Sequence, residues 1–113
     1  MQPVVYYCYD AYCGWCYGFS PVIKKIATTF KDKLSFEVLS GGMIPKENAR
    51  PISAIAGYIS EAYHRVEETT GIKFGEDYLW HIFNPEKSDW YQHSEKSAIA
   101  LCIIKEIQPE QQV

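Results

Sequence analysis

The sequence predicts an α/β fold, with a parallel βαβ unit in residues 1–45 and a mostly helical segment in residues 46–113. Two strand-like runs, 4–10 and 34–40, flank a stretch with helical periodicity and predict the first part. Apolar residues that recur at spacings of three and four predict the second part. Two strands joined through one helix pair in parallel, with a right-handed crossover.

In the first part, residues 4–10 (VVYYCYD) are β-branched and aromatic and lead into turn-forming residues, so they predict a buried strand. Pro21 lies inside the helix that follows and should bend it. Residues 34–40 (LSFEVLS) alternate between apolar and polar side chains, which predicts the second strand. One face of the helix is apolar and is formed by Phe19, Val22, Ile23, Ile26, Ala27 and Phe30.

In the second part, we predict a long helix that Gly71 would stop. A short helix over 77–83 and a turn at Pro85 follow in an aromatic, irregular stretch. Ser94 is the predicted N-cap of a last helix over 95–107, which a proline ends. The long helix shows its apolar face in Ile52, Ile55, Ala56, Ile59, Tyr63 and Val66.

The predicted sheet has only two strands, because no convincing third strand follows Ser40. A two-stranded parallel sheet is not stable by itself and needs further strands and cover on both faces. We therefore expect an incomplete sheet whose C-terminal strands and helix are missing, so that this sequence is the N-terminal part of a longer protein. Strands from a partner chain are the alternative.

Composition narrows the class of protein. The 113 residues are 47% hydrophobic, which excludes a disordered chain, and the net charge of -3 with scattered basic residues argues against a nucleic-acid partner. The apolar runs are too short to span a membrane, so no membrane partner is expected. The N-terminus, MQPVVYYCYD, lacks the basic and apolar regions of a signal peptide, which predicts a cytoplasmic protein.

The chemistry of the chain centres on Cys13-Gly14-Trp15-Cys16, where the first strand meets the helix. A helix start offers free backbone N–H groups and the positive end of the helix dipole, so a thiolate there is stabilised and its pKa falls. The thiolate is the nucleophile of thiol–disulfide exchange. A static disulfide or half of a zinc site is the alternative, but zinc wants four ligands and no second CxxC is present.

Aromatic side chains surround the motif. Tyr12, Trp15 and Tyr17 are predicted to contact the substrate, with Trp15 the strongest candidate because it lies between the two cysteines at a helix start. Tyr9 belongs either to this surface or to the core. Asp10 is either an acid or base during exchange or a turn carboxylate.

The remaining cysteines and the histidines are given structural roles. Cys8 and Cys102 stand in apolar surroundings and are expected to be small core residues. The three histidines are His64, His81 and His93. Because they are widely spaced, we expect them on the surface or on helices, without a catalytic role.

The strand, Cys13-Gly14-Trp15-Cys16 and helix together resemble the thioredoxin fold, and the helical segment resembles the insertion of DsbA-like oxidoreductases. Cys16-Tyr17-Gly18-Phe19 is similar to a Cys-Tyr-x-Phe sequence of many DsbA-like proteins, and Pro21 stands where thioredoxins carry a helix-kinking proline. Gly41-Gly42-Met43 and residues 94–105 resemble the FrnE-like branch of predicted protein-disulfide isomerases.

The resemblance implies that Cys13 is the exposed attacking thiol and Cys16 the buried resolving thiol of a protein-disulfide-isomerase-like enzyme. No metal or organic cofactor is implied. Gly14-Trp15 replaces the Pro-His of DsbA, so a strong oxidant is not implied. No proline has the context of the family's cis-proline loop, which we expect to lie beyond Val113.

The expected partners are thiols and disulfides of proteins or small molecules. Glutathione or a thioredoxin-type protein would supply the redox equivalents, and a dimer is left open. Two other functions stay open. One is that of the kappa-class glutathione transferases and hydroxychromene-carboxylate isomerases, which share the insertion but generally work from a lone serine or similar residue. The other is a binding module in which the CxxC is vestigial.

Overall fold

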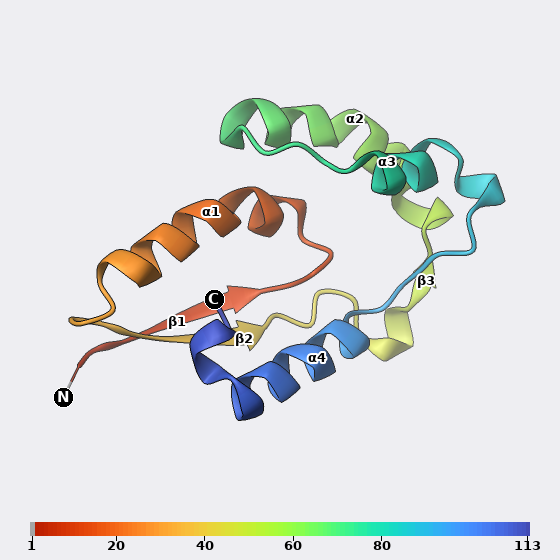
Figure 1. Ribbon diagram of the computed structural model, residues 1–113. Helices are drawn as coiled ribbons and strands as arrows, with labels where there is room; N and C mark the ends of the chain where they lie inside the picture. The colour runs from red at the N-terminus through yellow and green to blue at the C-terminus, as the bar shows by residue number, and fades with distance from the viewer. Residues whose placement is uncertain (1) are drawn as a thin grey trace.

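The βαβ unit forms as predicted in the computed structural model, which describes residues 2–113 (Figure 1). Strand β1 (Val4–Tyr9), helix α1 (Gly14–Thr29) and strand β2 (Ser35–Ser40) follow one another, and the two strands pair in parallel over their full lengths. Pro21 lies inside α1, as expected. Ser20 Oγ donates at 2.7 Å to the carbonyl of Tyr17, which would otherwise accept the N–H that proline lacks.

Three further helices follow, close to their predicted positions: α2 (Ser53–Thr70), α3 (Glu76–Phe83) and α4 (Ser94–Ile107). Gly71 ends α2 with a φ of 77°, a left-handed conformation that only glycine adopts readily. Single 3₁₀ turns stand before β3, after α3 and after α4, at Lys46–Asn48, Pro85–Lys87 and Pro109–Gln111.

Ser94 is the first residue of α4 and not its N-cap, so this prediction was wrong by one position. His93 takes the cap, where its Nδ1 accepts the N–H of Glu95 at 3.1 Å. Ser94 is buried instead, and its Oγ accepts the N–H of Ile44 at 2.9 Å. The Ser94 hydroxyl therefore does not cap α4 but connects two segments that are distant in sequence.

An antiparallel ribbon of two short strands, β3 (Arg50–Pro51) and β4 (Tyr91–Gln92), was not predicted. Two residues are too few for an alternating pattern to show. Close by, the N–H of Ser94 donates to the carbonyl of Ile44 at 2.8 Å. The ribbon and this bond hold the chain before α2 against the chain after α3, and α2 and α3 extend from this contact (Figure 1).

The buried core is small, and β1 is less buried than predicted. Alternate residues of β1 are exposed, among them Tyr6 and Cys8. Cys102 is exposed on α4 beside Ile103, so the prediction that both cysteines are core residues was wrong. No described element covers these faces, which explains their exposure. The buried apolar side chains are Ile23, Val38, Ile44, Ile52, Ala56, Val66 and Ile82.

The outer edge of β2 is covered by side chains of the C-terminal segment. The N–H of Val38 donates to Gln112 Oε1 at 2.9 Å, and its carbonyl accepts from Lys105 Nζ at the same distance. Lys105 also pairs with Glu37 at 3.0 Å. These contacts satisfy backbone groups that a further strand would otherwise take. Within residues 2–113, no helix is long and apolar enough to cross a membrane.

Candidate active site

The CxxC motif lies where β1 ends and α1 begins. Cys13 is the N-cap of α1, and its Sγ accepts the backbone N–H of Cys16 at 3.1 Å. The N–H of Cys13 in turn donates to the carbonyl of Asp10 at 3.1 Å. The predicted placement of the first cysteine at a helix start is therefore confirmed, and its sulfur faces the positive end of the helix dipole.

The two thiols differ in their surroundings. Both Cys13 and Cys16 are half-buried and free. Burial raises the pKa of the Cys16 thiol, and the hydrogen bond with Cys13 raises it further. Cys16 therefore keeps its proton at neutral pH, while Cys13 is the cysteine whose sulfur receives a backbone donor. This asymmetry fits an attacking and a resolving thiol.

Asp10 is a buried carboxylate, only 5% exposed, with both oxygens in use. Oδ1 accepts the N–H of Tyr12 and Oδ2 accepts the N–H of Met43, each at 2.8 Å. One side chain thus ties the loop before α1 to the loop after β2. The turn-carboxylate interpretation accounts for both hydrogen bonds, and this contact holds the loop that carries Cys13.

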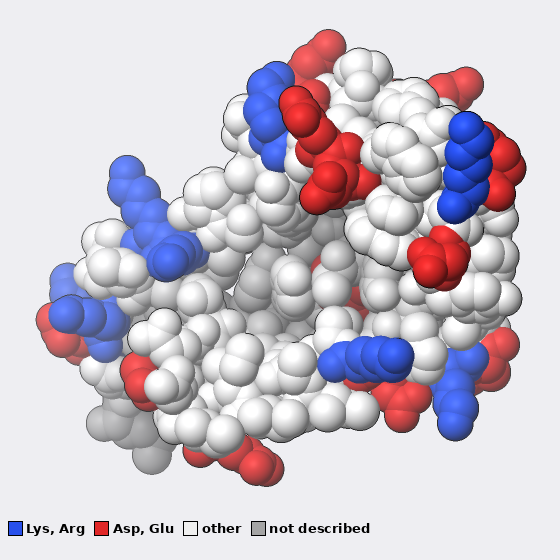
Figure 2. Space-filling view, turned by 45° about the vertical axis from the view of Figure 1, so that its right-hand side comes forward, with Lys and Arg blue, Asp and Glu red and all other residues white. Residues whose placement is uncertain are grey.

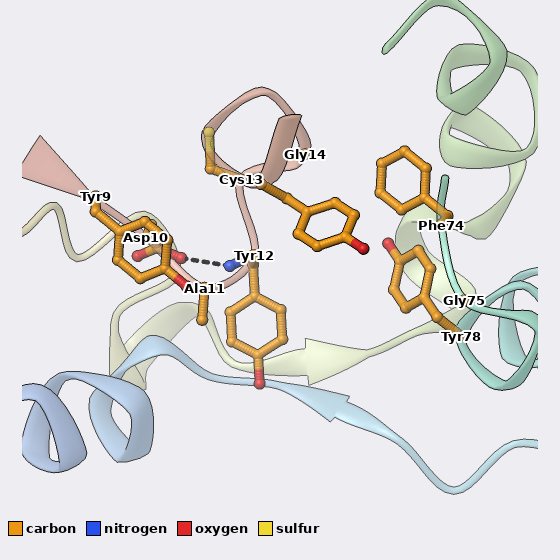
Figure 3. A pocket seen from close by; sticks show the side chains of 10 residues that line it. Tyr9, Asp10, Ala11, Tyr12, Cys13, Gly14, Phe74, Gly75 and Tyr78 are labelled. Carbon is orange, nitrogen blue, oxygen red and sulfur yellow. Dashed lines mark hydrogen bonds between the residues drawn. The ribbon is translucent and has the colours of Figure 1, made fainter. Parts of the chain in front are cut away.

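A cavity of about 290 Å³ with aromatic walls lies beside Cys13 (Figure 3). The ring of Tyr17 stands 5.3 Å from that of Phe74, and Phe74 stacks on Tyr78 at 5.7 Å. Tyr17 Oη donates to the carbonyl of Lys73 at 3.0 Å, which fixes its ring. Burial raises the pKa of Tyr78, so its phenol stays neutral and can donate a hydrogen bond.

Cys13 lies at the rim of this cavity, with its sulfur directed away from the ring of Tyr12 (Figure 3). The cavity wall includes Asp10, Tyr12 and Tyr17. Figure 2 shows a hollow on this face of the molecule. Uncharged residues line most of the hollow, and most of the charged side chains lie around its edge. The predicted aromatic surface next to the motif therefore takes the form of a cavity.

Trp15 is separated from that cavity. It is 48% exposed, as its place between the cysteines predicted, but it faces a different hollow beside α2. Tyr58, Glu61 and Arg65 contribute to that hollow. The predicted substrate contacts are thus divided between two sides of the motif, with Tyr12 and Tyr17 on one and Trp15 on the other.

Sequence reasoning missed Phe74 and Tyr78 as site residues. They follow the motif by some sixty positions. Tyr78 lies in the short helix predicted over 77–83 and Phe74 just before that aromatic stretch, and neither residue was connected with the motif. The packing of α2 on α1 brings them in: a Cβ built on Gly14 would lie 3.5 Å from the ring of Phe74. Spacing along the chain carries no signal for such a contact.

Within residues 2–113, no group of three or more His, Cys, Asp or Glu side chains is arranged to hold a metal ion. Cys13 and Cys16 therefore have no further ligands near them among the described residues. The site offers a dithiol, an N–H donor to one sulfur and an aromatic cavity.

Two solved structures have a similar fold. The crystal structure of a "putative protein disulfide isomerase from Nitrosomonas europaea" superposes with a TM-score of 0.73 and 25% identity, over 99% of this chain and 50% of that one. The cytosolic disulfide reductase DsbM from Pseudomonas aeruginosa gives the same TM-score at 26% identity, over 93% of this chain and 47% of that one. The chain therefore has the fold of DsbA-like thioredoxin-fold proteins.

This DsbA-like chain spans about half the length of the two solved structures. No protein-family model matches it, and no curated protein matches it. The predicted fold class is confirmed, including the helical insertion after the βαβ unit. The division at residue 45 and the FrnE-like branch stay predictions.

Proposed function

We propose that this DsbA-like chain carries the reactive dithiol of a thiol–disulfide oxidoreductase of the protein-disulfide-isomerase type. Cys13 would be the nucleophile and Cys16 the resolving thiol. The observation that carries the proposal is the N-cap sulfur of Cys13, which accepts the N–H of Cys16 beside an aromatic cavity. The names of the two similar proteins, an isomerase and a reductase, support it.

The exchange proceeds in two steps with balanced electrons. The Cys13 thiolate attacks one sulfur of a substrate disulfide, and the other substrate sulfur leaves as a thiolate that takes a proton from solvent. Cys16 then loses its proton and attacks the Cys13 sulfur, which breaks the mixed disulfide and releases the second substrate thiolate. Two electrons have passed to the substrate, and the Cys13–Cys16 disulfide remains.

The reverse sequence oxidises a substrate dithiol. A thiol or disulfide partner, glutathione or a thioredoxin-type protein, restores the starting state and sets the direction. We place the protein in the cytoplasm, where one similar protein, DsbM, is described as cytosolic. No metal or organic cofactor enters these steps, since both sulfurs come from the chain itself.

The substrate would meet the aromatic cavity as it reaches Cys13. Tyr12 and Tyr17 give apolar contact on this side, and Trp15 gives it on the other. Asp10 acts by holding the loop. Burial is the main cause of the raised pKa of Cys16; a backbone hydrogen bond with Asp10 lowers that pKa, and the Asp10 charge raises it. Transfer of the Cys16 proton to Asp10 is a separate role that can be tested.

An equilibrium titration against a glutathione redox series tests the function, with thiol trapping as the readout. Cys8 and Cys102 are exposed and would react too, so both are replaced by serine throughout. We expect one reversible two-electron transition that disappears in Cys16→Ser. If the thiols show no transition, or can be trapped only after metal chelation, the proposed function is wrong.

A further inference from the structure

Tyr7 of β1 has a buried hydroxyl without a hydrogen-bond partner. Its Oη is closed off from solvent, and none of the described residues bonds to it. The ring packs against aromatic neighbours, with its centroid 6.2 Å from that of Phe19 on α1 and 6.4 Å from that of Tyr9. A buried phenol without a partner costs free energy, and a partner that forms in another state of the protein would recover this cost.

Cys16 starts from the face of α1 that covers Tyr7. Phe19 and Ile23 follow Cys16 by three and seven positions, which places all three residues on one face of the helix. Phe19 contacts the ring of Tyr7, and Ile23 lines the same cavity as Tyr7. The resolving thiol therefore stands one helical turn from the residue that packs on this phenol.

The effect of charge on Tyr7 agrees with this placement. Burial is the main cause that raises the pKa of the Tyr7 phenol, and a negative charge on Cys16 raises it next, ahead of a charge on Cys13. Tyr7 therefore keeps its proton while Cys16 is a thiolate, so that its hydroxyl can act as a hydrogen-bond donor. Further ionisable side chains around the pair are Asp10, Tyr9 and Lys24.

We propose that Tyr7 is a further catalytic residue, whose hydroxyl donates a hydrogen bond to the Cys16 thiolate as that thiolate forms in the resolving step. This inference rests on the proposed function. A neutral thiol is a weak acceptor, which accounts for the lack of a bond to Tyr7 Oη while both cysteines are free thiols. A thiolate is a strong acceptor, and the donor stabilises its charge where water has no access.

The step balances without a further reactant. A solvent base takes the Cys16 proton, while Tyr7 keeps its own. The Cys16 sulfur then attacks the Cys13 sulfur with its electron pair, so that the bond between Cys13 and the substrate breaks and the substrate leaves as a thiolate. The hydrogen bond from Tyr7 loses its charged acceptor as the Cys13–Cys16 disulfide forms.

Tyr7→Phe, which removes only the hydroxyl, tests the proposal in full chain that carries Cys8→Ser and Cys102→Ser. With Cys13→Ser added, the pH of half-maximal alkylation of Cys16 by iodoacetamide should rise by about one pH unit, because the thiolate loses a charge-assisted hydrogen bond. Resolution of the mixed disulfide near neutral pH should slow by only about three- to fourfold, since a more basic thiolate is also a better nucleophile. The first step, measured in Cys16→Ser, should keep its rate.

Tyr6→Phe is the matched control, because Tyr6 precedes Tyr7 in β1, points to the other face of the sheet and is 62% exposed. It should leave the alkylation profile and both rates unchanged. An unaltered half-maximal pH in Tyr7→Phe, or an equal shift in Tyr6→Phe, would overturn the proposal. A larger shift in Tyr9→Phe than in Tyr7→Phe would also overturn it, because the donor would then be the neighbouring phenol.

Stability separates this role from a structural one. The free energy of unfolding of Tyr7→Phe at neutral pH should equal or exceed that of its parent, because the variant removes a buried hydroxyl that has no partner. A clear loss would show that the hydroxyl is already bonded in the free dithiol form, which contradicts the proposal. The alkylation profile needs no disulfide substrate, so its outcome is independent of the glutathione titration that tests the proposed function.

Discussion

Thr70 lies against Gly18 where α2 crosses the start of α1. A Cβ built on Gly18 would stand 2.7 Å from Thr70 Cγ2 and 2.9 Å from its Oγ1, closer than real side chains come. Gly18 is buried, and Thr70 Oγ1 is fixed by donating to the carbonyl of Val66 at 2.7 Å. Because residue 18 has no side chain, α2 can approach α1 closely, and the segment after α2 places Phe74 beside Gly14, the first residue of α1.

Gly18→Ala should therefore destabilise the fold by about 1–3 kcal/mol, because a methyl group must push the two helices apart. The free energy of unfolding from a denaturant titration measures this. Thr70→Ala in the same chain should recover part of the loss, since it removes the two nearest atoms.

Gly57→Ala is the matched control. Gly57 also lies inside a helix, but nothing stands within 4 Å of its built Cβ. Alanine there should be neutral or stabilise by up to about 1 kcal/mol through helix propensity. Equal effects of the two glycine substitutions would show that the α1–α2 contact is not tight.

A second prediction concerns the proposed roles of the two thiols, Cys13 as the nucleophile and Cys16 as the resolving thiol. Cys16→Ser should accumulate a mixed disulfide at Cys13 with a peptide disulfide, because the resolving thiol is absent. Cys13→Ser should accumulate none at comparable times. Intact-mass spectrometry in the Cys8→Ser, Cys102→Ser background distinguishes these outcomes, and trapping in the opposite variant would reverse the two roles.

A third prediction follows from the raised pKa of Cys16, whose main cause is burial. In Cys13→Ser, alkylation of Cys16 by iodoacetamide should rise with pH and reach half its maximum at a higher pH than free cysteine does. The raised pKa also makes stability depend on pH, because the folded state holds the Cys16 proton more tightly than the unfolded chain does. The free energy of unfolding should therefore fall as pH rises through the folded pKa. Alkylation at the same pH as free cysteine would contradict the effect of burial.

The local parts of this molecule could be predicted from sequence. The βαβ unit, the helix stop at Gly71 and the helix start at Cys13 each depend on neighbouring residues, and the structure confirms all three. Their signals are hydrophobic periodicity, a glycine after the last apolar position of a helix, and a motif at the end of a strand, all of which a single sequence displays.

The predictions that were wrong or missing concern features that depend on contacts between residues distant in sequence. An apolar neighbourhood along the chain suggested that Cys8 is buried, but burial needs an element to cover that face of β1, and none of the described elements does so. Phe74 enters the site only because Gly18 lets α2 approach α1. The β3–β4 ribbon is too short to carry a pattern.

The last prediction separates two roles of Asp10. Asp10→Asn keeps one oxygen acceptor but presents an NH₂ group to the other backbone N–H, so one of the two hydrogen bonds is lost and two donors face each other. The loop should loosen, with a loss of about 1–3 kcal/mol in the free energy of unfolding. Asp32→Asn, at an exposed carboxylate, should cost almost nothing.

The pH dependence of exchange decides between positioning and proton transfer. If Asp10 only positions the loop, Asp10→Asn slows mixed-disulfide resolution by a similar factor at every pH at which the variant is folded. If Asp10 accepts the Cys16 proton, the slowing is largest near neutral pH and shrinks as pH approaches the raised pKa of Cys16, where hydroxide and solvent remove that proton. We expect the uniform slowing, because both oxygens of Asp10 already accept backbone N–H groups at 2.8 Å.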